Sequence, residues 1–438
     1  MSTNLFNPAD KRSYPARWPL IRGKQLFRVI DERSEDGAEE LLSVSHITGI
    51  TPRSQKNVTM FQSESLVGYK LCKIGDIAAN TMWTWQGAIG ISKYAGVVRP
   101  SYNVYRQKAD VFNPRYLDLL LRERRLVDVY HSLSTGIRPS RLRLYPDVFL
   151  TIDFPVPPRE EQDQIVRFLE WKVSGINKLI AIKKQRRALI FDLIQLHLFS
   201  DDVSQSSIGR IEAVFPEHWK SIKARRIFSE RIEKGHTEDE LLAVTQDKGV
   251  VFKKDCDSHY VQPSNFESQK LVYPGDFIIS LRSFQGGIEH SRIKGLVSAA
   301  YTVMELNPSY SRIEEYYGFL FKSKPFIQYL NSCVNDIRDG KKIGYKDFRD
   351  CPLPIPPVRT LEKINILRKE YDKATEELNR CTSLLHELRT RLISDVVTGK
   401  IDIRGIEIPE YEFVDEYTDT ENEGGGEEEI EEQEGAEK

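Results

Sequence analysis

The sequence is poor in cysteine and has no long apolar run. Five cysteines are scattered through 438 residues without a C-x-x-C pair, so we expect reduced thiols rather than disulfides or a zinc site. No stretch approaches 18 consecutive apolar residues, which argues against a membrane span. The first ten residues lack a charged start followed by an apolar run, so no signal peptide is expected. Together these absences predict a cytoplasmic protein.

The common catalytic motifs are also missing. There is no G-x-x-x-x-G-K-[ST] loop for a nucleotide phosphate, no G-x-S-x-G and no H-E-x-x-H. The Asn/Asp-Pro-Pro-aromatic site of an adenine methyltransferase does not occur either. The sequence therefore predicts a binding protein with no catalytic residue, no metal and no cofactor of its own.

Charge is distributed unevenly along the chain. Residues 410–438 contain 14 acidic residues and one basic residue, although the net charge of the whole chain is only −2. The remaining 409 residues therefore carry a net charge of +11. A basic body suits a polyanionic partner. The acidic end has few apolar residues and a run of three glycines, Gly424–Gly426, so we expect it to be disordered.

The second half of the chain repeats the first at a distance of 199 to 201 positions. Matching pairs include Trp18 with Trp219 and Pro158 with Pro357. A period this long indicates two similar domains, not a short-repeat solenoid. Each half contains short β-prone runs, then a helix that in the first half is capped by Asn113, then a proline-rich corner. In both halves a Gly-Asp pair recurs, and we interpret Asp76 and Asp276 as turn residues rather than catalytic carboxylates.

Each proline corner leads into a long amphipathic segment. The second segment has an unbroken alternation of three- and four-residue steps: Ile364, Leu367, Tyr371, Ala374, Leu378, Cys381, Leu385, Leu388 and Leu392. The first segment repeats less regularly: Ile165, Leu169, Val173, Ile176, Ile180, Lys183, Ile190 and Leu193. We predict that the two helices pack on each other within one chain, the alternative being a coiled coil that only dimerises the protein.

These patterns predict an α+β protein in which two similar α/β domains are joined by an antiparallel intramolecular coiled coil. The expected boundaries are residues 1–154 for the first domain, 155–200 for its helix, 201–353 for the second domain, 354–400 for its helix and 401–438 for an acidic disordered tail.

Loops at matching positions of the repeat carry aromatic, amide and basic side chains. Glutamine can bond an adenine edge and arginine a guanine edge, while neighbouring basic residues suit phosphates. The predicted DNA-binding residues are Trp83, Trp85, Gln86, Arg138, Arg141 and Arg143 in the first half, and Arg282, Ser283, Gln285, Arg338, Lys341 and Lys342 in the second. The alternative is that these are solvated surface loops with an aromatic ring tucked into the core.

With its two proline corners and long helices, the chain resembles the specificity subunit of Type I restriction-modification systems. The matching segments are Phe154–Gln162, Pro352–Pro357 and Leu392–Ile401, and the resemblance spans residues 15–405. It differs at Thr360–Glu362, where the family usually has Glu-Gln, and at Trp83–Gly87, where an arginine-containing loop is common.

The resemblance implies two target recognition domains, each reading one half of a bipartite, asymmetric double-stranded DNA target. The paired helices would act as a spacer and as a platform for two methyltransferase (modification) subunits, which bind S-adenosylmethionine. ATP-dependent restriction subunits, with Mg, would join for cleavage, so this chain would be a non-catalytic subunit of an endonuclease complex. A helix of about 39 residues extends about 58 Å, which agrees with a spacer role. The alternative function is a cytoplasmic coiled-coil scaffold with two protein-binding domains.

Overall fold

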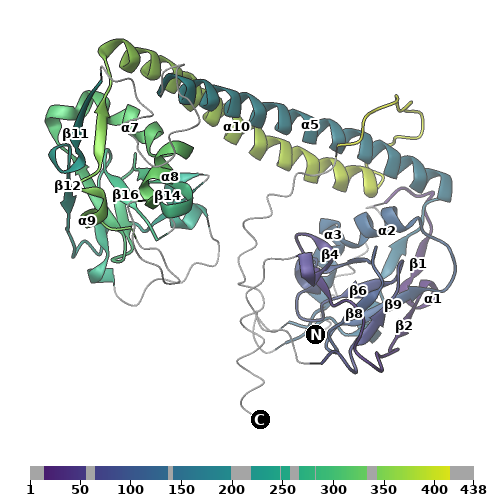
Figure 1. Cartoon of the computed structure of the whole chain (residues 1–438). Coiled ribbons are helices and arrows are strands. Elements are labelled where there is room, and N and C mark those ends of the chain that lie inside the picture. Colours follow the sequence, from purple (N-terminus) through teal and green to yellow (C-terminus); the bar gives the residue numbers. More distant parts are fainter. Residues whose placement is uncertain are drawn as a thin grey trace, which may run out of the picture. The chain divides into compact units, whose positions relative to one another are not determined.

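The computed structural model describes residues 14–55, 65–136, 142–198, 219–246, 248–256, 266–281, 283–332 and 343–414 (Figure 1). The chain divides into two compact units: residues 1–181 with 380–438, and residues 182–379. This division passes through both long helices, whereas the sequence placed the domain boundaries at the helix ends. Each unit combines short antiparallel strands with helices, so the predicted α+β class with two similar domains is confirmed.

The first unit contains a four-stranded antiparallel sheet in the order β2–β9–β6–β7. Its strands are Phe27–Ile30 (β2), Ile77–Ala79 (β6), Ile89–Ile91 (β7) and Asn103–Gln107 (β9). All three residues of β6 are buried, which explains why this strand is continuously apolar. Further strand pairs are Leu20–Arg22 (β1) with Asp153–Pro155 (β10), Leu42–Ser45 (β3) with Gly49–Pro52 (β4), and Lys70–Cys72 (β5) with Gly96–Val98 (β8).

Helix α2 (Pro114–Leu121) begins as the sequence predicts. The Asn113 side chain accepts hydrogen bonds from the backbone N–H groups of Arg115 and Tyr116, and Pro114 occupies the first turn. The other helical elements of this unit are Gly23–Leu26 (α1), Arg53–Gln55 (η1), Thr84–Gln86 (η2), Arg124–Leu133 (α3) and Pro146–Phe149 (α4). The apolar face of α2 is fully buried in the main core of the unit.

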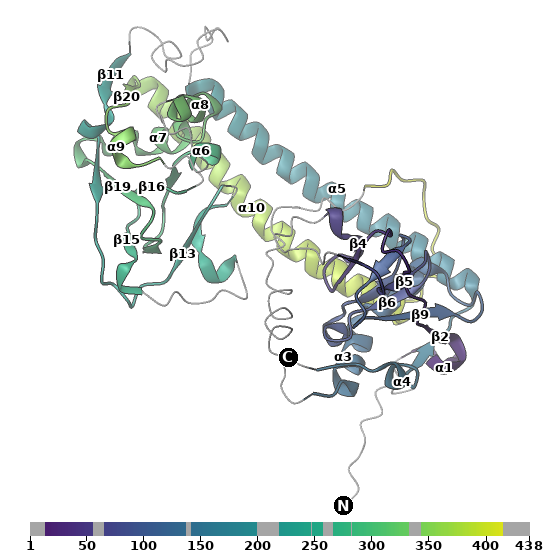
Figure 2. The ribbon, with the colours of Figure 1, turned by 60° about the horizontal axis from the view of Figure 1, so that its bottom comes forward.

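The second unit repeats this pattern with the sheet order β12–β19–β16–β17, of which β16 and β19 are labelled in Figure 2. These strands are Phe228–Arg231 (β12), Phe277–Ile279 (β16), Glu289–His290 (β17) and Thr302–Leu306 (β19). The strand pairs are Lys220–Lys223 (β11) with Pro352–Ile355 (β20), Leu242–Thr245 (β13) with Gly249–Phe252 (β14), and Lys270–Val272 (β15) with Gly295–Val297 (β18). Its helical elements are Ala224–Arg226 (η5), Lys253–Asp255 (η6), Phe266–Ser268 (η7), Ser283–Gly286 (α6), Pro308–Ile313 (η8), Glu314–Leu320 (α7), Lys324–Ser332 (α8) and Tyr345–Phe348 (α9).

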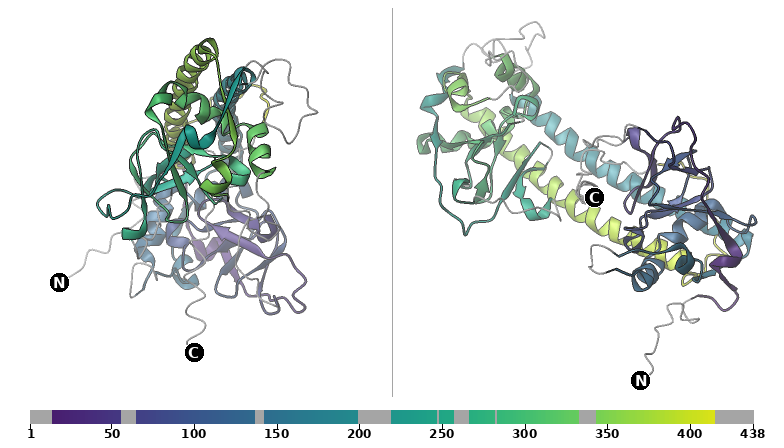
Figure 3. Two further views of the ribbon diagram at one scale, coloured as in Figure 1. Left: turned by 60° about the vertical axis from the view of Figure 1, so that its left-hand side comes forward. Right: turned by 90° about the horizontal axis from the view of Figure 1, so that it is seen from below.

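Helices α5 (Arg159–Leu198) and α10 (Val358–Val397) each contain 40 residues and begin directly after a Pro-Pro pair. The first unit contains the beginning of α5 and the end of α10, and the second unit contains the reverse, so the helices are antiparallel (Figure 3). In the second unit the Phe191 and Tyr371 rings lie 5.9 Å apart. Nearby, Arg186 Nη1 lies 2.9 Å from Glu377 Oε2. The predicted pairing of the two helices within one chain is therefore confirmed.

The predicted seam is followed only in part. Ile364, Ala374 and Leu378 of α10 are buried. In contrast, Leu388 is 52 % exposed and Leu193 of α5 is 47 % exposed. Regular spacing identified the helices, but it did not decide which residues close the contact between them.

The C-terminal end of each long helix joins a domain core. In the first unit, the Tyr116 hydroxyl donates to the carbonyl oxygen of Val397 at 3.3 Å. In the second unit, the Tyr316 hydroxyl donates to the carbonyl oxygen of Leu198 at 3.5 Å. Both tyrosines and both helix ends are fully buried, so each domain encloses the last turn of one long helix.

Residues 401–414 lie against α5 and are visible in yellow in Figure 1. Ser174 Oγ donates to the carbonyl oxygen of Glu412 at 2.8 Å and accepts from the Val414 N–H at 2.8 Å. Ile403 is 2 % exposed and belongs to the core of the first unit. The sequence assigned these residues to the disordered tail, but their backbone is bonded to the helix. The rest of the expected tail, residues 415–438, lies outside the described residues.

Candidate nucleic-acid interface

The loop between β6 and β7 is shaped by a buried asparagine. The Asn80 side chain accepts from the Met82 N–H at 3.1 Å and donates to the Tyr102 hydroxyl at 3.0 Å. The Thr84 hydroxyl donates to the Asn80 carbonyl oxygen. Gly87 ends the turn with φ = 96°, a conformation that favours glycine. These bonds set the position of the tryptophans predicted to contact DNA.

Trp83 and Trp85 form an aromatic pair on this loop. Their ring centroids are 6.1 Å apart with an interplanar angle of 17°, and the Trp85 ring lies 5.4 Å from that of His131 in α3. Trp85 Nε1 donates to the Met82 carbonyl oxygen at 2.7 Å, so its N–H is satisfied inside the protein. Both tryptophans and Gln86 are half-buried. The groups of this loop that can contact a ligand are therefore the two aromatic rings and the Gln86 amide. The indole N–H of Trp85 is already bonded within the protein.

The basic segment of the first unit adjoins this loop. The Leu144 N–H donates to the Thr81 carbonyl oxygen at 3.2 Å, and Arg143 forms a backbone bridge with Thr135. The Arg143 side chain is exposed. The structure thus brings Arg143, His131 and the tryptophan pair to one region, while the predicted Arg138 and Arg141 lie outside the described residues.

The matching loop of the second unit is different. Ser283 is 1 % exposed and its hydroxyl accepts from the Ser280 N–H at 2.9 Å, a geometry that gives this serine a structural role in the turn. Gln285 is exposed and Phe284 packs against the core. The predicted Arg282, Arg338, Lys341 and Lys342 lie outside the described residues. Of the predicted residues that the structure describes in this unit, only Gln285 presents its side chain to solvent.

Asp76 and Asp276 are turn residues, as predicted. Asp76 accepts from the Lys73 N–H at 2.8 Å, and Asp276 accepts from the Tyr273 N–H at 2.7 Å. Both are buried and each is paired with an arginine. Burial raises the pKa of Asp276 to about 6.

The arginines that pair with Asp76 and Asp276 lie on strands that are not equivalent in the two units. The comparison of the two halves of the sequence did not predict this difference. In the first unit Arg106 of β9 pairs with Asp76, with Nε 2.6 Å from Oδ1. In the second unit Arg231 of β12 pairs with Asp276, with Nη1 2.6 Å from Oδ2. The position that matches Arg106 holds Glu305, which also contacts Arg231. Because β2 pairs with β9 and β12 with β19, either strand of the pair can supply the cation.

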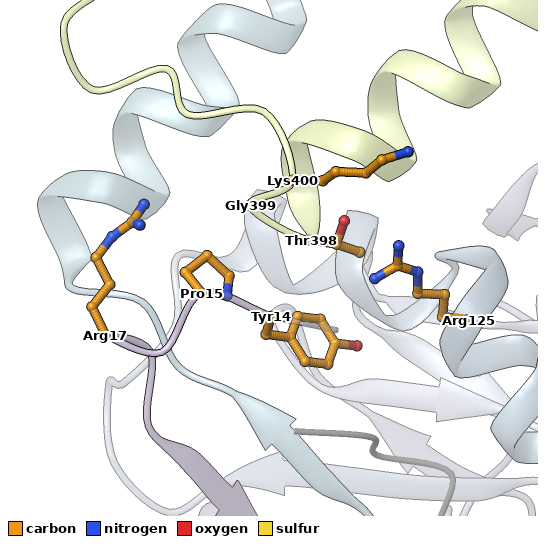
Figure 4. Close-up of a pocket in the computed structure, with 7 residues that line it drawn as sticks. All are labelled: Tyr14, Pro15, Arg17, Arg125, Thr398, Gly399 and Lys400. Atoms are coloured by element: carbon orange, nitrogen blue, oxygen red, sulfur yellow. The ribbon is translucent and has the colours of Figure 1, made fainter. Parts of the chain in front are cut away.

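Each unit has a cavity among its described residues that lies away from the predicted DNA-binding loops. The first, of about 490 Å³, is lined by Tyr14, Pro15, Arg17, Arg125, Thr398, Gly399 and Lys400 (Figure 4). Two of its cations are paired, Arg17 with Glu161 and Lys400 with Asp395. The second cavity, of about 550 Å³, is lined by several acidic side chains, including Asp276 and Glu305. Much of the positive charge in the first cavity is therefore countered and the second cavity is acidic, so neither suits a nucleic-acid backbone.

One cluster in the described part of the chain has the spacing of a metal site. Ligand atoms of His236, Glu238 and Asp239 lie within 4.8 Å of one another. However, His236 Nε2 lies 2.9 Å from Glu233, and Asp239 pairs with Lys294 at 3.0 Å. These ion pairs account for the cluster as ordinary surface charge, and it gives no reason to assign a metal.

Helix α5 presents a second apolar seam to solvent. It follows the alternation of three- and four-residue steps along Leu179, Ile182, Arg186, Leu189, Leu193 and Leu196, whose five apolar members are 47–62 % exposed. A heptad seam of this kind buries its surface only against another helix. This spacing can be read from the sequence, but the sequence alone placed Leu193 in the seam that faces the other helix.

Within the described residues, no helix is both long and apolar enough to cross a membrane.

A known structure shares this fold. No family model matches the sequence. One similar chain comes from a structure that describes complex assembly and conformational transition of the type I R-M system; it is 16 % identical, has a TM-score of 0.54, and the match covers 89 % of this chain and 99 % of that one. The HsdS subunit from Thermoanaerobacter tengcongensis is 17 % identical, with a TM-score of 0.40 over 89 % of this chain and 98 % of that one. The Type-I restriction-modification system S subunit from M. genitalium is 14 % identical, with a TM-score of 0.36 over 87 % and 96 %. The first of these likenesses establishes a shared fold.

Proposed function

We propose that this protein is the DNA sequence-recognition subunit of a Type I restriction-modification enzyme and acts in the cytoplasm. The observation that carries the proposal is the arrangement of two similar domains, with different loop chemistry, on one antiparallel helix pair. A fold shared with a chain of a type I R-M system supports it. A fold alone does not determine function, so the proposal also rests on the side chains of the loops and on the two long helices.

The loops favour an asymmetric target. The first domain offers the Trp83–Trp85 pair and Gln86, which suit contact with a thymine methyl group and an adenine edge. The second domain offers an exposed Gln285 without an aromatic pair. Two domains with the same frame and different contact residues are expected to read different half-sites.

The helices favour a spacer role. A 40-residue helix such as α5 extends about 60 Å at about 1.5 Å per residue. One turn of DNA measures about 34–36 Å. A spacer of this length is therefore sufficient for half-sites that are separated by more than one turn.

The exposed seam of α5 favours docking of other subunits. Its partner would be an amphipathic helix of another chain, and we assign it to a methyltransferase subunit, of which two are expected. S-adenosylmethionine would belong to those subunits, and ATP and Mg to restriction subunits, since this chain carries none of the motifs that would bind them. In this proposal the reaction takes place entirely in the partners.

The test is an exchange of domains in the assembled enzyme. Residues 15–150 are replaced by the corresponding domain of another specificity subunit, and the methylated adenines are then mapped across a genome. We expect one half of the target to change and the other half to stay the same. A change in both halves, or a chain that forms a homodimer with no salt-dependent affinity for duplex DNA, would instead support a protein-binding scaffold.

A further inference from the structure

Residues 401–414, here called the strap, follow α5 in the direction of its C-terminus. Gln164 Nε2 donates to the Ile406 carbonyl oxygen at 2.8 Å, and Asn177 Nδ2 donates to the Val414 carbonyl oxygen at 3.1 Å. Between them, Ser174 is 3 % exposed and bonds both to Glu412 and to Val414. From Ile406 to Val414 the strap covers eight residues, and over the same distance α5 covers thirteen, from Gln164 to Asn177. The last described residue of the strap, Val414, therefore lies beside Asn177.

The part of α5 that lies ahead of the strap is strongly basic. Between Asn177 and Phe191 there are no acidic residues and five basic ones: Lys178, Lys183, Lys184, Arg186 and Arg187. One carboxylate from α10, that of Glu377, pairs with both Lys183 and Arg186. The helix itself supplies no negative charge in this stretch, so its own residues carry a net charge of +5.

The chain that follows the strap has the opposite charge. Residues 415–438 contain twelve acidic residues and one basic residue. The strap also makes a first acidic contact with this surface, because Glu412 Oε2 lies 4.0 Å from Lys178 Nζ. The strap therefore ends beside a stretch of helix whose charge is opposite to that of the residues that follow it in the sequence.

We propose that residues 415–438 are an intramolecular ligand for the basic middle of α5, Lys178–Arg187. The strap anchors one end of this segment, so its effective concentration at the helix is high and weak ion pairs are sufficient to hold it. The same stretch contains the start of the exposed seam, at Leu179 and Ile182. The proposed binding surface on α5 is therefore both basic and apolar.

The full-length chain allows a direct test by zero-length carbodiimide crosslinking, which joins carboxylates to lysine amines in contact. Crosslinks from residues 415–438 are expected to concentrate on Lys178, Lys183 and Lys184. Raising the salt from ~0.1 M to ~1 M shortens the screening length from about 10 Å to about 3 Å, so their yield should fall several-fold. Crosslinks spread over exposed lysines of both long helices in proportion to exposure would overturn the proposal.

A double substitution separates the strap from the charges. Ser174→Ala with Asn177→Ala removes the three hydrogen bonds that hold the strap's end, but changes no lysine and no carboxylate. Crosslinks to α5 should fall several-fold, while Thr390→Ala, an exposed hydroxyl of α10, should leave them unchanged. An unchanged yield in the double variant would contradict delivery of the segment by the strap.

A mixture of isotopically labelled and unlabelled chains decides between one copy and two. Crosslinks within one isotopic species alone are expected for an intramolecular ligand. Mixed crosslinks would assign the acidic segment to a second copy and overturn the proposal. Neither result depends on whether the protein reads DNA, because no nucleic acid takes part in the experiment.

Discussion

Glu123 and Ser394 lie 271 positions apart in the sequence and are joined by a hydrogen bond of 2.6 Å from Ser394 Oγ to Glu123 Oε1. Glu123 also caps α3, since its Oε2 accepts from the Arg125 N–H at 2.8 Å. Glu123 is 3 % exposed. Among the described residues, the matching residue of the second unit, Ser323, bonds to nearby groups of its own helices, the Leu320 carbonyl oxygen and the Phe326 N–H. The first domain therefore adds this side-chain bond to the Tyr116 contact at the end of α10. At the end of α5 in the second domain, the described residues show the Tyr316 contact.

Replacing Glu123 with alanine is expected to destabilise the protein. The change removes a helix cap and leaves the Ser394 hydroxyl without its acceptor, which together should lower the free energy of unfolding by about 1–3 kcal/mol. Chemical denaturation measures this loss. A double-mutant cycle with Ser394→Ala should yield a coupling energy, and strictly additive effects would show that the two side chains do not cooperate.

Gly399 is expected to tolerate no side chain. Its φ is 70°, and a Cβ there would lie 2.5 Å from Pro15 Cγ and 2.6 Å from Trp18 Cη2. Gly399→Ala should cost at least about 1–3 kcal/mol of stability, because backbone strain and a steric clash add together. Gly405→Ala is the matched control, since a Cβ at that position meets nothing within 4 Å. Equal melting temperatures for the two variants would contradict this packing.

Stability is expected to depend on the ionisation of Asp276. Its folded-state pKa of about 6 lies above the usual value of 3.8, mainly because of burial, although Arg231 opposes the shift and Glu305 adds to it. The folded state therefore binds this proton more tightly than the unfolded state between about pH 4 and pH 6. The resulting stabilisation is complete below about pH 4 and is lost as the pH rises through about 6.

Denaturation of the wild type and of Asp276→Asn across this pH range isolates that contribution. The wild type should lose stability relative to the variant as the pH rises from about 4 to above 6. Asp76→Asn serves as the control for loss of the same turn geometry in the first unit. A constant difference between wild type and Asp276→Asn would rule out a raised pKa at this position.

The exposed seam of α5 is expected to carry partner binding rather than stability. Leu189→Glu places a charge on a side chain that is 56 % exposed, so the fold should persist, but an apolar contact with another helix should be lost. Co-purification with the methyltransferase subunit should drop sharply, while the melting temperature stays within a few degrees. The neighbouring exposed Ala188→Glu is the control, and an equal loss of the partner from both variants would argue against the seam.

Local patterns predicted the elements well. The Asn113-Pro114 start of α2, the Pro-Pro starts of both long helices and the turn role of Asp76 are all encoded in a few adjacent residues, and all were found. The candidate site was less predictable. Ser283 looked like a loop residue able to reach DNA, but the turn buries its hydroxyl against Ser280. Exposure depends on what packs over a residue, and sequence spacing does not report it.

By itself, the sequence determined the duplication, the two long helices, the basic body and the acidic end, because periodicity, proline position and charge are properties of neighbouring residues. Only the tertiary structure decided which face of α5 packs against α10 and which face remains exposed to solvent. It also decided that residues 401–414 lie along α5. Likewise, only the tertiary structure showed that the arginine partner of the buried aspartate comes from β9 in the first unit and from β12 in the second. The physical reason is that such contacts join residues far apart in the chain, and several different partners can satisfy the same buried charge or apolar face.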